Sequence, residues 1–328
     1  MDPGPILQLA TGYWASQALL TANRMGLFAA LAASDATAEE IAERLGSRPR
    51  STRLLLEACA ALGLLHKAGT RYANTDLTTT FLVPGSPAFL GDALRYSDDL
   101  YQPWGGLEEA VRRDAPTLPP SEILGDDPGK TRHFVRGMHN RALGIARGLV
   151  EVIDLTGRHR LLDVGGGPGT YSCLLAQRYD GLRATVLDLP AVVEIAREII
   201  AEMGATQRVA TTAGDFLTTP WPGDNDALLI SGVFHRQSEA ECRRLIATAC
   251  DALVPGGQLI VADVFTTSGA RSPFAALFGL NMLVSAPGGG VHSAADVGQW
   301  MSAAGFADVA LHPLPPPMPH IALTARRP

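Results

Sequence analysis

The stretch 161-LLDVGGGPGT-170 decides the fold of this chain. A short apolar run ends in Asp163, Val164 and a cluster of glycines, and the helix-like segment TYSCLLAQRY (170–179) follows. Gly165 and Gly167 permit a tight turn and let a ligand come close to the backbone. The stretch therefore predicts a buried strand, a glycine turn and a helix, with a ligand site at the turn.

The chain after residue 160 alternates strand-like and helix-like segments. RATVLDL (183–189), RVATTAG (208–214), DALLISGVF (226–234) and QLIVADVF (258–265) are strand-like, and apolar-periodic segments separate them. This alternation predicts an α/β fold, a doubly wound parallel sheet with helices on both faces. The last two extended pieces, DVALHPLP (308–315) and HIALTA (320–325), are joined by a proline-rich link. They predict an antiparallel pair that closes the sheet.

The first part of the chain has a different pattern. SDATAEEIAERLG (34–46) and RSTRLLLEACAALGLL (50–65) predict two helices, with Ser34 or Thr37 as the first cap, and HKAGTRYANT (66–75) predicts a hairpin. The order helix, turn, helix, hairpin is that of a winged helix. We expect three parts: this domain over 1–95, a mostly helical connector over 96–157, and the sheet domain over 158–328.

A winged helix can bind DNA, so a DNA-binding regulator is the remote alternative. Residues 1–100 carry eight Lys and Arg against ten Asp and Glu, whereas a DNA-binding domain normally has a basic face. The net charge of the 328-residue chain is −6, which gives no reason to expect nucleic acid or an anionic membrane as a partner. This charge balance argues against a DNA-binding regulator.

Residues 3–23 carry no charge, yet polar side chains interrupt the run, so we expect a helix buried against a partner surface and no membrane span. The four cysteines form no CxxC pair. They predict reduced thiols in a cytosolic protein.

The ends of three consecutive predicted strands carry residues suited to an adenosine. Asp188 ends the strand after the glycine loop, about twenty residues on, where a carboxylate can accept hydrogen bonds from ribose hydroxyls. After the third strand, Gly214 allows close approach, Asp215 can accept from an adenine amino group and Phe216 can cover the ring. The glycine loop contains no Lys or Arg, so a sulfonium nucleoside fits better than a pyrophosphate.

These motifs resemble one family jointly. LLDVGGGPGT, LDLP (187–190), GDF (214–216), PGG (255–257) and AAGF (303–306) occur in the order found in small-molecule O-methyltransferases that use S-adenosylmethionine, including plant phenolic and bacterial natural-product enzymes. The stretch GLNMLVS (279–285) resembles the acetylserotonin O-methyltransferase branch. The resemblance covers the chain from about residue 5 to its end.

The resemblance implies a class I methyltransferase Rossmann-like domain preceded by a winged-helix dimerisation domain, hence a homodimer. It also implies S-adenosylmethionine as methyl donor, S-adenosylhomocysteine as product and a small-molecule acceptor. Ser231 stands where relatives usually carry a basic residue near the adenine. The positions expected to hold the donor are Asp163, Gly165, Gly167, Asp188, Leu189, Gly214, Asp215, Phe216 and Ser231.

His235, in SGVFHRQ (231–237), follows the fourth predicted strand, where ligands of open α/β sheets bind. A phenol has a pKa of about 10 and an imidazole one of about 6.5, so His235 is a plausible general base for methylating a hydroxyl. The alternative is a core or capping histidine. No clustered metal-ligand spacing is present, and we expect no metal.

In the resembling family two acids orient this histidine. The first corresponds to Asp263, and the second falls at Val291 and is absent. Arg236 and Gln237 replace the acid and tryptophan that usually follow the histidine. If the segment remains extended, Arg236 points away from His235.

The resemblance also indicates acceptor residues, and it implies that the connector over 96–157 contributes to the acceptor pocket. Asn281 corresponds to an acceptor-binding position, with Met282 beside it. Phe134, Met138 and His139 lie on the segment that covers the donor site in the family, although the i, i+4 spacing of the first two also fits a core stripe. His292 either reaches the pocket or caps the helix that follows it.

The function expected is methyl transfer to a hydroxyl of a small, largely apolar or aromatic molecule. An N-, C- or S-methyltransferase, or a relative that does not methylate, is the alternative on the same fold.

Overall fold

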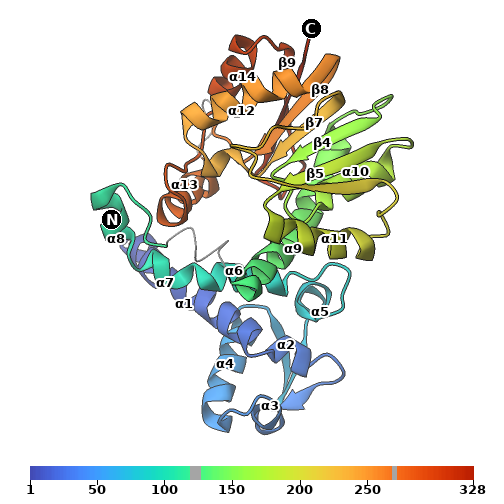
Figure 1. Cartoon of the computed structure of the whole chain (residues 1–328). Coiled ribbons are helices and arrows are strands. Elements are labelled where there is room, and N and C mark those ends of the chain that lie inside the picture. The colour runs from blue at the N-terminus through green and yellow to red at the C-terminus, as the bar shows by residue number, and fades with distance from the viewer. Residues whose placement is uncertain (119–126, 268–271) are drawn as a thin grey trace. The chain divides into compact units, whose positions relative to one another are not determined.

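The computed structural model describes residues 1–118, 127–267 and 272–328. The chain forms two compact units, residues 1–99 and 100–328 (Figure 1). The three-part division expected from the sequence stays a prediction.

The first unit is built around a helix–turn–helix and a hairpin. Its helices are α1 (Gly4–Arg24), α2 (Leu27–Ala30), α3 (Ala38–Arg44), α4 (Pro49–Ala61), α5 (Asp76–Leu82) and α6 (Gly91–Asp99). The strands β1 (Ala36–Thr37), β2 (Leu65–Ala68) and β3 (Arg71–Asn74) form a small sheet in the order β1-β3-β2. Thr37 begins α3 with a capping box, in which its hydroxyl accepts from the N–H of Glu40 and the Glu40 carboxylate accepts from the N–H of Thr37.

The second unit holds a seven-stranded sheet in the order β6-β5-β4-β7-β8-β10-β9. Its strands are β4 (Arg160–Val164), β5 (Arg183–Asp188), β6 (Val209–Ala213), β7 (Asn225–Ser231), β8 (Leu253–Asp263), β9 (Ala307–Pro313) and β10 (Ile321–Arg326). Strands β4 to β8 pair in parallel, and β10 pairs antiparallel with both β8 and β9. The predicted parallel sheet and its closing antiparallel pair are confirmed.

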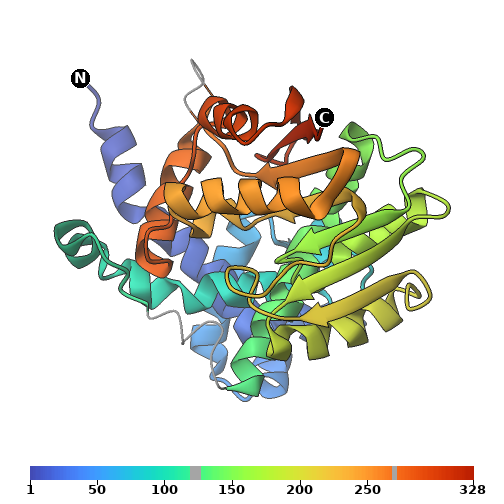
Figure 2. The ribbon, with the colours of Figure 1, turned by 45° about the horizontal axis from the view of Figure 1, so that its top comes forward.

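Helices cover both faces of this sheet (Figure 2). On one face lie α9 (Pro128–Val152), α10 (Thr170–Arg178) and α11 (Pro190–Glu202), and on the other lie α12 (Glu239–Ala252) and α14 (Ala294–Ala303). Each face has its own apolar core, because the strand residues alternate between the two faces: Leu228 and Ile230 pack with α12, whereas Ala227 and Leu229 pack on the α9 side. The rest of the unit consists of α7 (Tyr101–Trp104), α8 (Leu107–Arg113) and α13 (Pro273–Ser285).

The carboxyl ends of the parallel strands meet at one edge of the sheet. Asp163 on β4 is in register with Val186 on β5 and Leu229 on β7, and Ser231 on β7 is in register with Ala262 on β8. The loops that follow β4, β5, β6, β7 and β8 therefore lie at the same edge, and these loops carry most of the site residues expected from the sequence.

Candidate active site

The glycine loop turns the chain sharply at the carboxyl end of β4. Gly165 has a φ of +65°, and a Cβ at this position would lie 2.7 Å from Cγ2 of Val233 and 3.2 Å from the ring of Phe216. Gly167 has a φ of +52°, and its N–H donates to Oδ2 of Asp188 over 2.8 Å. A side chain at Gly165 would be strained and would also clash, so the loop conformation requires glycine there.

Asp163 lies buried under this loop. Its Oδ2 accepts a hydrogen bond from Oγ of Ser172 over 2.7 Å, while its buried Oδ1 has no partner among the described residues. Burial raises the pKa of the Asp163 carboxyl to about 7, and the charge of Asp188 adds to the rise. A buried acceptor without a partner is rare in folded proteins, and it marks a place where a ligand donor would be accommodated.

Asp188 links the first two strand ends. Its Oδ2 accepts from the N–H of Gly167 and its Oδ1 from the N–H of Leu189, over 2.8 and 2.7 Å. The side chain is nearly buried, and burial raises its pKa. A carboxylate oxygen accepts about two hydrogen bonds, so both oxygens keep capacity for a hydroxyl donor.

The third strand end closes the same site. The N–H of Gly214 donates to the backbone carbonyl of Asp188 over 2.9 Å. The Asp215 carboxylate accepts from the N–H of Leu217 over 2.9 Å, and the half-buried Phe216 lies beside Gly165. The structure thus brings together residues that the sequence places on three separate loops.

His235 forms a hydrogen-bonded pair with Asp263. Its Nδ1 lies 2.8 Å from Oδ1 of Asp263, and its backbone N–H donates to Oδ2 over 3.2 Å. The His235 side chain is 16% exposed, and its ring meets Phe278 edge-on at a centroid distance of 5.0 Å. Because an ionised carboxylate only accepts, Nδ1 carries the proton and Nε2 of the neutral ring is left as an acceptor.

The Asp263 carboxylate stays ionised although it is buried. Burial opposes its charge, but electrostatic attraction by the His235 ring and the hydrogen bonds from His235 and from the N–H of Val264 outweigh burial, and they hold the pKa of Asp263 below its usual value.

The segment that carries His235 is not extended. Gly232, with a φ of +68°, turns the chain after β7, and Phe234–Arg236 form one turn of 3-10 helix, η2. The expectation that Arg236 points away from His235 assumed an extended segment and therefore does not apply. The half-buried Arg236 makes no ion pair with any described residue.

The expected acceptor residues are more dispersed. Asn281 accepts a hydrogen bond at Oδ1 from the indole N–H of Trp104 over 2.8 Å, which leaves its amide N–H groups for a ligand. Met282 is 2% exposed and packs inside the unit. Phe134 packs against an apolar cluster that includes residues of α11, and Met138 is half-buried on the same helix, α9.

Two expected acceptor histidines contact other parts of the site. Nδ1 of His139 lies 2.8 Å from Oγ1 of Thr170, the first residue of α10 after the glycine loop. Burial lowers the pKa of His139, and the charge of Arg136 adds to this effect. Nε2 of His292 lies 3.1 Å from the carbonyl oxygens of both Phe234 and Gln237, which flank His235. His292 does not cap α14, because the side chain of Ser293 takes that position.

Comparison with known proteins identifies the family to which this chain belongs. The profile of the O-methyltransferase domain matches residues 106–307, and that of the O-methyltransferase dimerisation domain matches residues 7–84. The 3-hydroxy-5-methyl-1-naphthoate 3-O-methyltransferase of Streptomyces sahachiroi is 38% identical over 312 residues, which cover 94% of this chain and 90% of that protein. This chain belongs to the O-methyltransferase family.

Two further relatives are informative for this O-methyltransferase. The N,N-dimethyltransferase OxyT of Streptomyces rimosus is 33% identical over 271 residues, covering 80% of this chain and 78% of OxyT. The crystal structure of human N-acetylserotonin methyltransferase in complex with SAM matches with a TM-score of 0.90 at 26% identity, covering 100% of this chain and 98% of that one. The expected family, fold class and enzyme class are confirmed, and so is S-adenosylmethionine as the donor of the family.

The sequence did not single out two residues of this O-methyltransferase that belong near the site. Arg141 is half-buried on α9 and has no ion-pair partner among the described residues. Burial raises the pKa of Tyr171 to about 12, and the charge of Arg141 opposes this rise. Nδ1 of His320 is buried without a partner among the described residues; burial lowers the pKa of His320 to about 4, the charge of Arg141 adds to this effect and the charge of Asp263 opposes it. Arg141 stands three residues after Met138, a helical spacing that could have indicated it. No sequence signal indicates His320, because its position depends on the pairing of β10 with β8.

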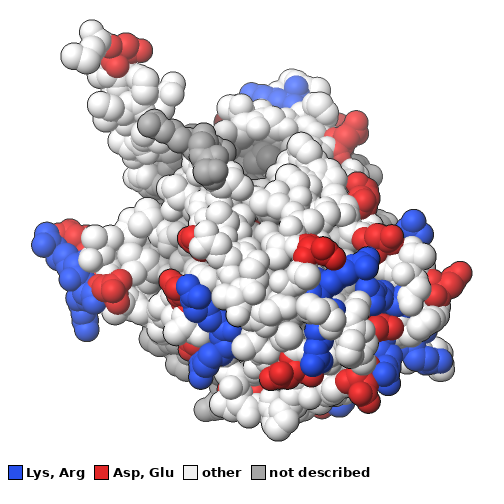
Figure 3. All heavy atoms as spheres, turned by 90° about the horizontal axis from the view of Figure 1, so that it is seen from above, with Lys and Arg blue, Asp and Glu red and all other residues white. Residues whose placement is uncertain are grey.

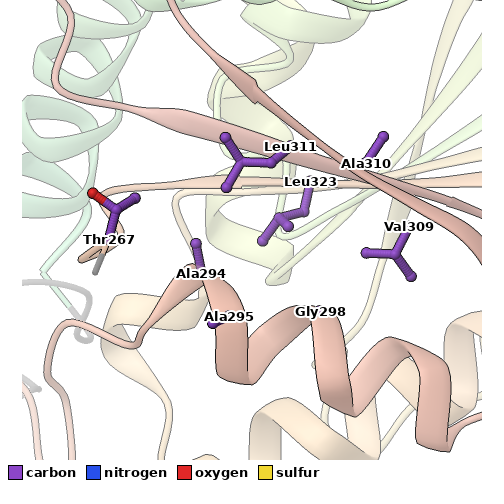
Figure 4. A pocket seen from close by; sticks show the side chains of 8 residues that line it. All are labelled: Thr267, Ala294, Ala295, Gly298, Val309, Ala310, Leu311 and Leu323. Carbon is purple, nitrogen blue, oxygen red and sulfur yellow. The ribbon is translucent and has the colours of Figure 1, made fainter. Parts of the chain in front are cut away.

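A groove of this O-methyltransferase is lined by none of the expected site residues. It has a volume of about 260 Å³ and lies between α14 and the strands β9 and β10 (Figure 4). Its lining residues are Thr267, Ala294, Ala295, Gly298, Val309, Ala310, Leu311 and Leu323. On the face drawn in Figure 3, acidic and basic side chains are interspersed. In the described part of the chain, no group of three or more His, Cys, Asp or Glu is arranged to hold a metal ion, and no described helix is long and apolar enough to cross a membrane.

Proposed function

We propose that this O-methyltransferase transfers the methyl group of S-adenosylmethionine to a hydroxyl of a small, largely apolar or aromatic molecule, with His235 as general base. The observation that carries the proposal is the His235–Asp263 pair, 2.8 Å apart, at the sheet edge that also holds the glycine loop. When bound, S-adenosylmethionine supplies a methyl carbon made electrophilic by its sulfonium sulfur.

In this proposal His235 accepts the proton of the acceptor hydroxyl at Nε2. Asp263 holds the ring in the Nδ1–H tautomer and stabilises the imidazolium that forms, as the carboxylate of a catalytic triad does. Such a base contributes about 10²- to 10⁴-fold to the rate, and positioning of the two reactants supplies much of the rest. The proposal uses no metal, because the imidazole performs the deprotonation.

The residues of the glycine loop and the three strand ends fit an adenosine donor. The open space beside Gly167, the spare acceptor capacity of Asp188 and the Oδ1 of Asp163, which has no partner among the described residues, are compatible with a polar nucleoside. A cation is a strong hydrogen-bonding partner for a methionine carboxylate, and Arg141 is a half-buried cation without an ion-pair partner in the described part of the unit. We therefore assign these residues to the donor together with Gly167, Leu189, Gly214, Asp215, Phe216 and Ser231.

The acceptor is proposed to lie beyond His235, against Phe278 and the amide N–H groups of Asn281. His139 on α9 contacts Thr170 beside the donor loop, and Met138 precedes it on the same helix; Phe134 packs against the α11 cluster and Met282 is buried beside Asn281. The name of the Streptomyces sahachiroi relative indicates a hydroxynaphthoate as its acceptor, which supports an aromatic hydroxyl as the class of acceptor here.

Transfer to nitrogen is the second candidate. The OxyT relative is named an N,N-dimethyltransferase, so the fold also serves amine acceptors. A neutral amine needs less help from a base, so this candidate predicts that loss of His235 has little effect on turnover.

The chain is also proposed to form a homodimer through its N-terminal domain. A dimerisation domain is present at residues 7–84, and α1 exposes a set of large apolar side chains: Ile6, Leu7, Leu9, Tyr13 and Trp14. A cluster of exposed apolar side chains on one helix is typical of a surface that a partner covers. The cytosolic location stays a prediction.

A screen of hydroxynaphthoates, other phenols, amines and thiols with S-adenosylmethionine, read by mass spectrometry, tests the function. We expect a gain of one methyl group on a phenolic hydroxyl. His235→Ala should then lose at least about a hundredfold in turnover while it keeps donor affinity. Methylation confined to amines, or turnover of His235→Ala within about tenfold of wild type, would overturn the proposal.

A further inference from the structure

The η2 turn, which carries His235, is hydrogen-bonded to a segment that is distant in the sequence, residues 289–292. The N–H of Gly290 donates to the carbonyl of His235 over 2.9 Å. Nε2 of His292 lies 3.1 Å from the carbonyl oxygens of Phe234 and Gln237. Three carbonyl groups of one short turn are thus paired with a segment more than fifty residues further along the chain.

The chemistry of these contacts fixes the proton on His292. A backbone carbonyl only accepts hydrogen bonds, so Nε2 must carry the proton that it shares between the two oxygens. Phe234 also receives the N–H of Gln237, whereas the carbonyl of Gln237 has the His292 ring as its main donor. Loss of the ring N–H would leave that carbonyl without its donor, because the sulfur of Cys242 lies 3.9 Å away.

The ring of His292 is itself held in place. Trp300 meets it edge-on at a centroid distance of 5.4 Å, and the guanidinium of Arg243 lies 5.0 Å from the centre of the Trp300 ring. Sγ of the fully buried Cys242 lies 3.5 Å from Nε2. These contacts oppose rotation of the ring, so it can act as a fixed donor.

We propose that His292 is a positioning residue for methyl transfer, which fixes the η2 turn so that the His235 ring stays paired with Asp263 and presents Nε2 to the acceptor. The inference rests on the proposed function of His235. Position 291, where the resembling family carries a second orienting acid, is Val291 in this chain, and a Cβ on Gly279 of α13 would lie 3.9 Å from its side chain. Val291 has no polar group that could bond His235. Its neighbour His292 instead bonds the backbone carbonyls of Phe234 and Gln237, on either side of His235.

A purely structural role for His292 and a positioning role differ in what they change at His235. A positioning role requires that loss of the ring N–H loosens the His235–Asp263 pair while the donor site remains intact. In the described part of the chain, no hydrogen bond joins His292 to the glycine loop or to the three strand ends.

The first test is NMR of the full-length enzyme labelled with ¹⁵N-histidine and saturated with S-adenosylhomocysteine. Wild type should show a His235 ring protonated at Nδ1, with its proton protected by Asp263, and a His292 ring protonated at Nε2. His292→Phe keeps a ring without a donor, and we expect it to broaden or abolish the His235 Nδ1–H signal. His292→Gln restores an N–H at about the same reach and should recover the signal.

His312→Phe is the matched control. His312 is also half-buried and makes one hydrogen bond, from its Nε2 to Oγ1 of Thr324 over 2.9 Å, on strands β9 and β10. His312→Phe should therefore leave the His235 Nδ1–H signal unchanged.

The second test uses the acceptor found by the screen. It measures kcat and the KM for this acceptor, and separately the affinity for S-adenosylmethionine. Because misplacement by about 1 Å can cost about a hundredfold, we expect His292→Phe to lower kcat about ten- to a hundredfold with donor affinity within about twofold of wild type. His292→Gln should recover most of kcat.

Two results would overturn the inference: a His235 Nδ1–H signal in His292→Phe identical to that of wild type, or an equal loss of kcat in His292→Phe and His312→Phe. His235→Ala is measured in parallel. If His235→Ala keeps its turnover, the proposed function fails; if it loses turnover and His292→Phe does not, the positioning role alone fails.

Discussion

Replacement of Asp263 by Asn should disable His235 without removing it. In wild type the ionised carboxylate accepts from Nδ1 of His235, from the backbone N–H of His235 and from the N–H of Val264, over 2.8, 3.2 and 2.7 Å. An Asn side chain has one oxygen and one NH₂ group. Oδ1 of the carboxylate accepts both from Nδ1 of His235 and from the N–H of Val264, whereas Oδ2 accepts from the backbone N–H of His235. With the Asn oxygen in the place of Oδ1, the ring keeps its proton on Nδ1; with the NH₂ group there, Nδ1 must act as acceptor.

Either orientation weakens His235 as a base. With the amide oxygen facing Nδ1, the side chain no longer carries the negative charge that stabilises the imidazolium; with the NH₂ group facing Nδ1, the ring proton moves to Nε2, the atom proposed to receive the acceptor proton. The rate should fall by about 10²- to 10⁴-fold, the whole contribution of a general base. At 1.36 kcal/mol per factor of ten, the barrier rises by roughly 3 to 5 kcal/mol.

The assay is initial-rate methyl transfer to a phenolic acceptor, with S-adenosylmethionine affinity measured by calorimetry. Asp226→Asn is the matched control, because the Asp226 carboxylate accepts from the N–H groups of His159 and Arg160 at the opposite end of β4, over 2.8 Å each. It should keep turnover within about twofold of wild type.

A double variant tests whether the two residues act together. Asp263→Asn combined with His235→Ala should be no slower than His235→Ala alone, because residues that act as one unit are not additive. Turnover of Asp263→Asn within about tenfold of wild type, or full additivity in the double variant, would refute the reasoning.

Three further predictions follow from other parts of the structure. Burial raises the pKa of Asp163 from 3.8 to about 7, so its ionisation destabilises the folded protein. The free energy of unfolding is therefore highest below about pH 4 and falls as the pH rises to about 7. In urea unfolding without ligand, Asp163→Asn should be more stable than wild type by roughly 2 to 4 kcal/mol at pH 8 and about equally stable at pH 4. Arg141→Met should weaken S-adenosylmethionine binding by about tenfold or more in calorimetry and leave the affinity for 5′-methylthioadenosine, which lacks the carboxylate, unchanged. Trp14→Ser, at a side chain 62% exposed on α1, should raise the dimer dissociation constant measured by sedimentation, whereas an unchanged dimer would exclude α1 from the interface.

The local motifs of the sequence predicted the strand ends that carry the expected donor residues. The glycine loop, Asp188 and Asp215 follow strands that the apolar pattern indicates, and parallel pairing brings the ends of these strands together. The structure places these residues where the pattern expects them, because backbone geometry within a few residues determines each position.

The acceptor side could not be predicted in the same way. The sequence indicates that His235 follows β7, but the 3-10 turn depends on Gly232 and on hydrogen bonds from residues 290 and 292. Arg141 lies on α9 and His320 just before β10, and the electrostatic coupling between them depends on packing of the whole unit. The contacts of His292 with the η2 turn are likewise visible only in the folded chain.

The most direct test of His235 as general base compares two phenolic acceptors of similar shape. One has a hydroxyl pKa of about 10, and the other carries an electron-withdrawing group, such as a nitro group, so that it is already ionised at the assay pH. For His235→Ala we predict a loss of at least about a hundredfold on the first acceptor and of less than about tenfold on the second. An equal loss on both acceptors would contradict the role of His235 in removing the proton.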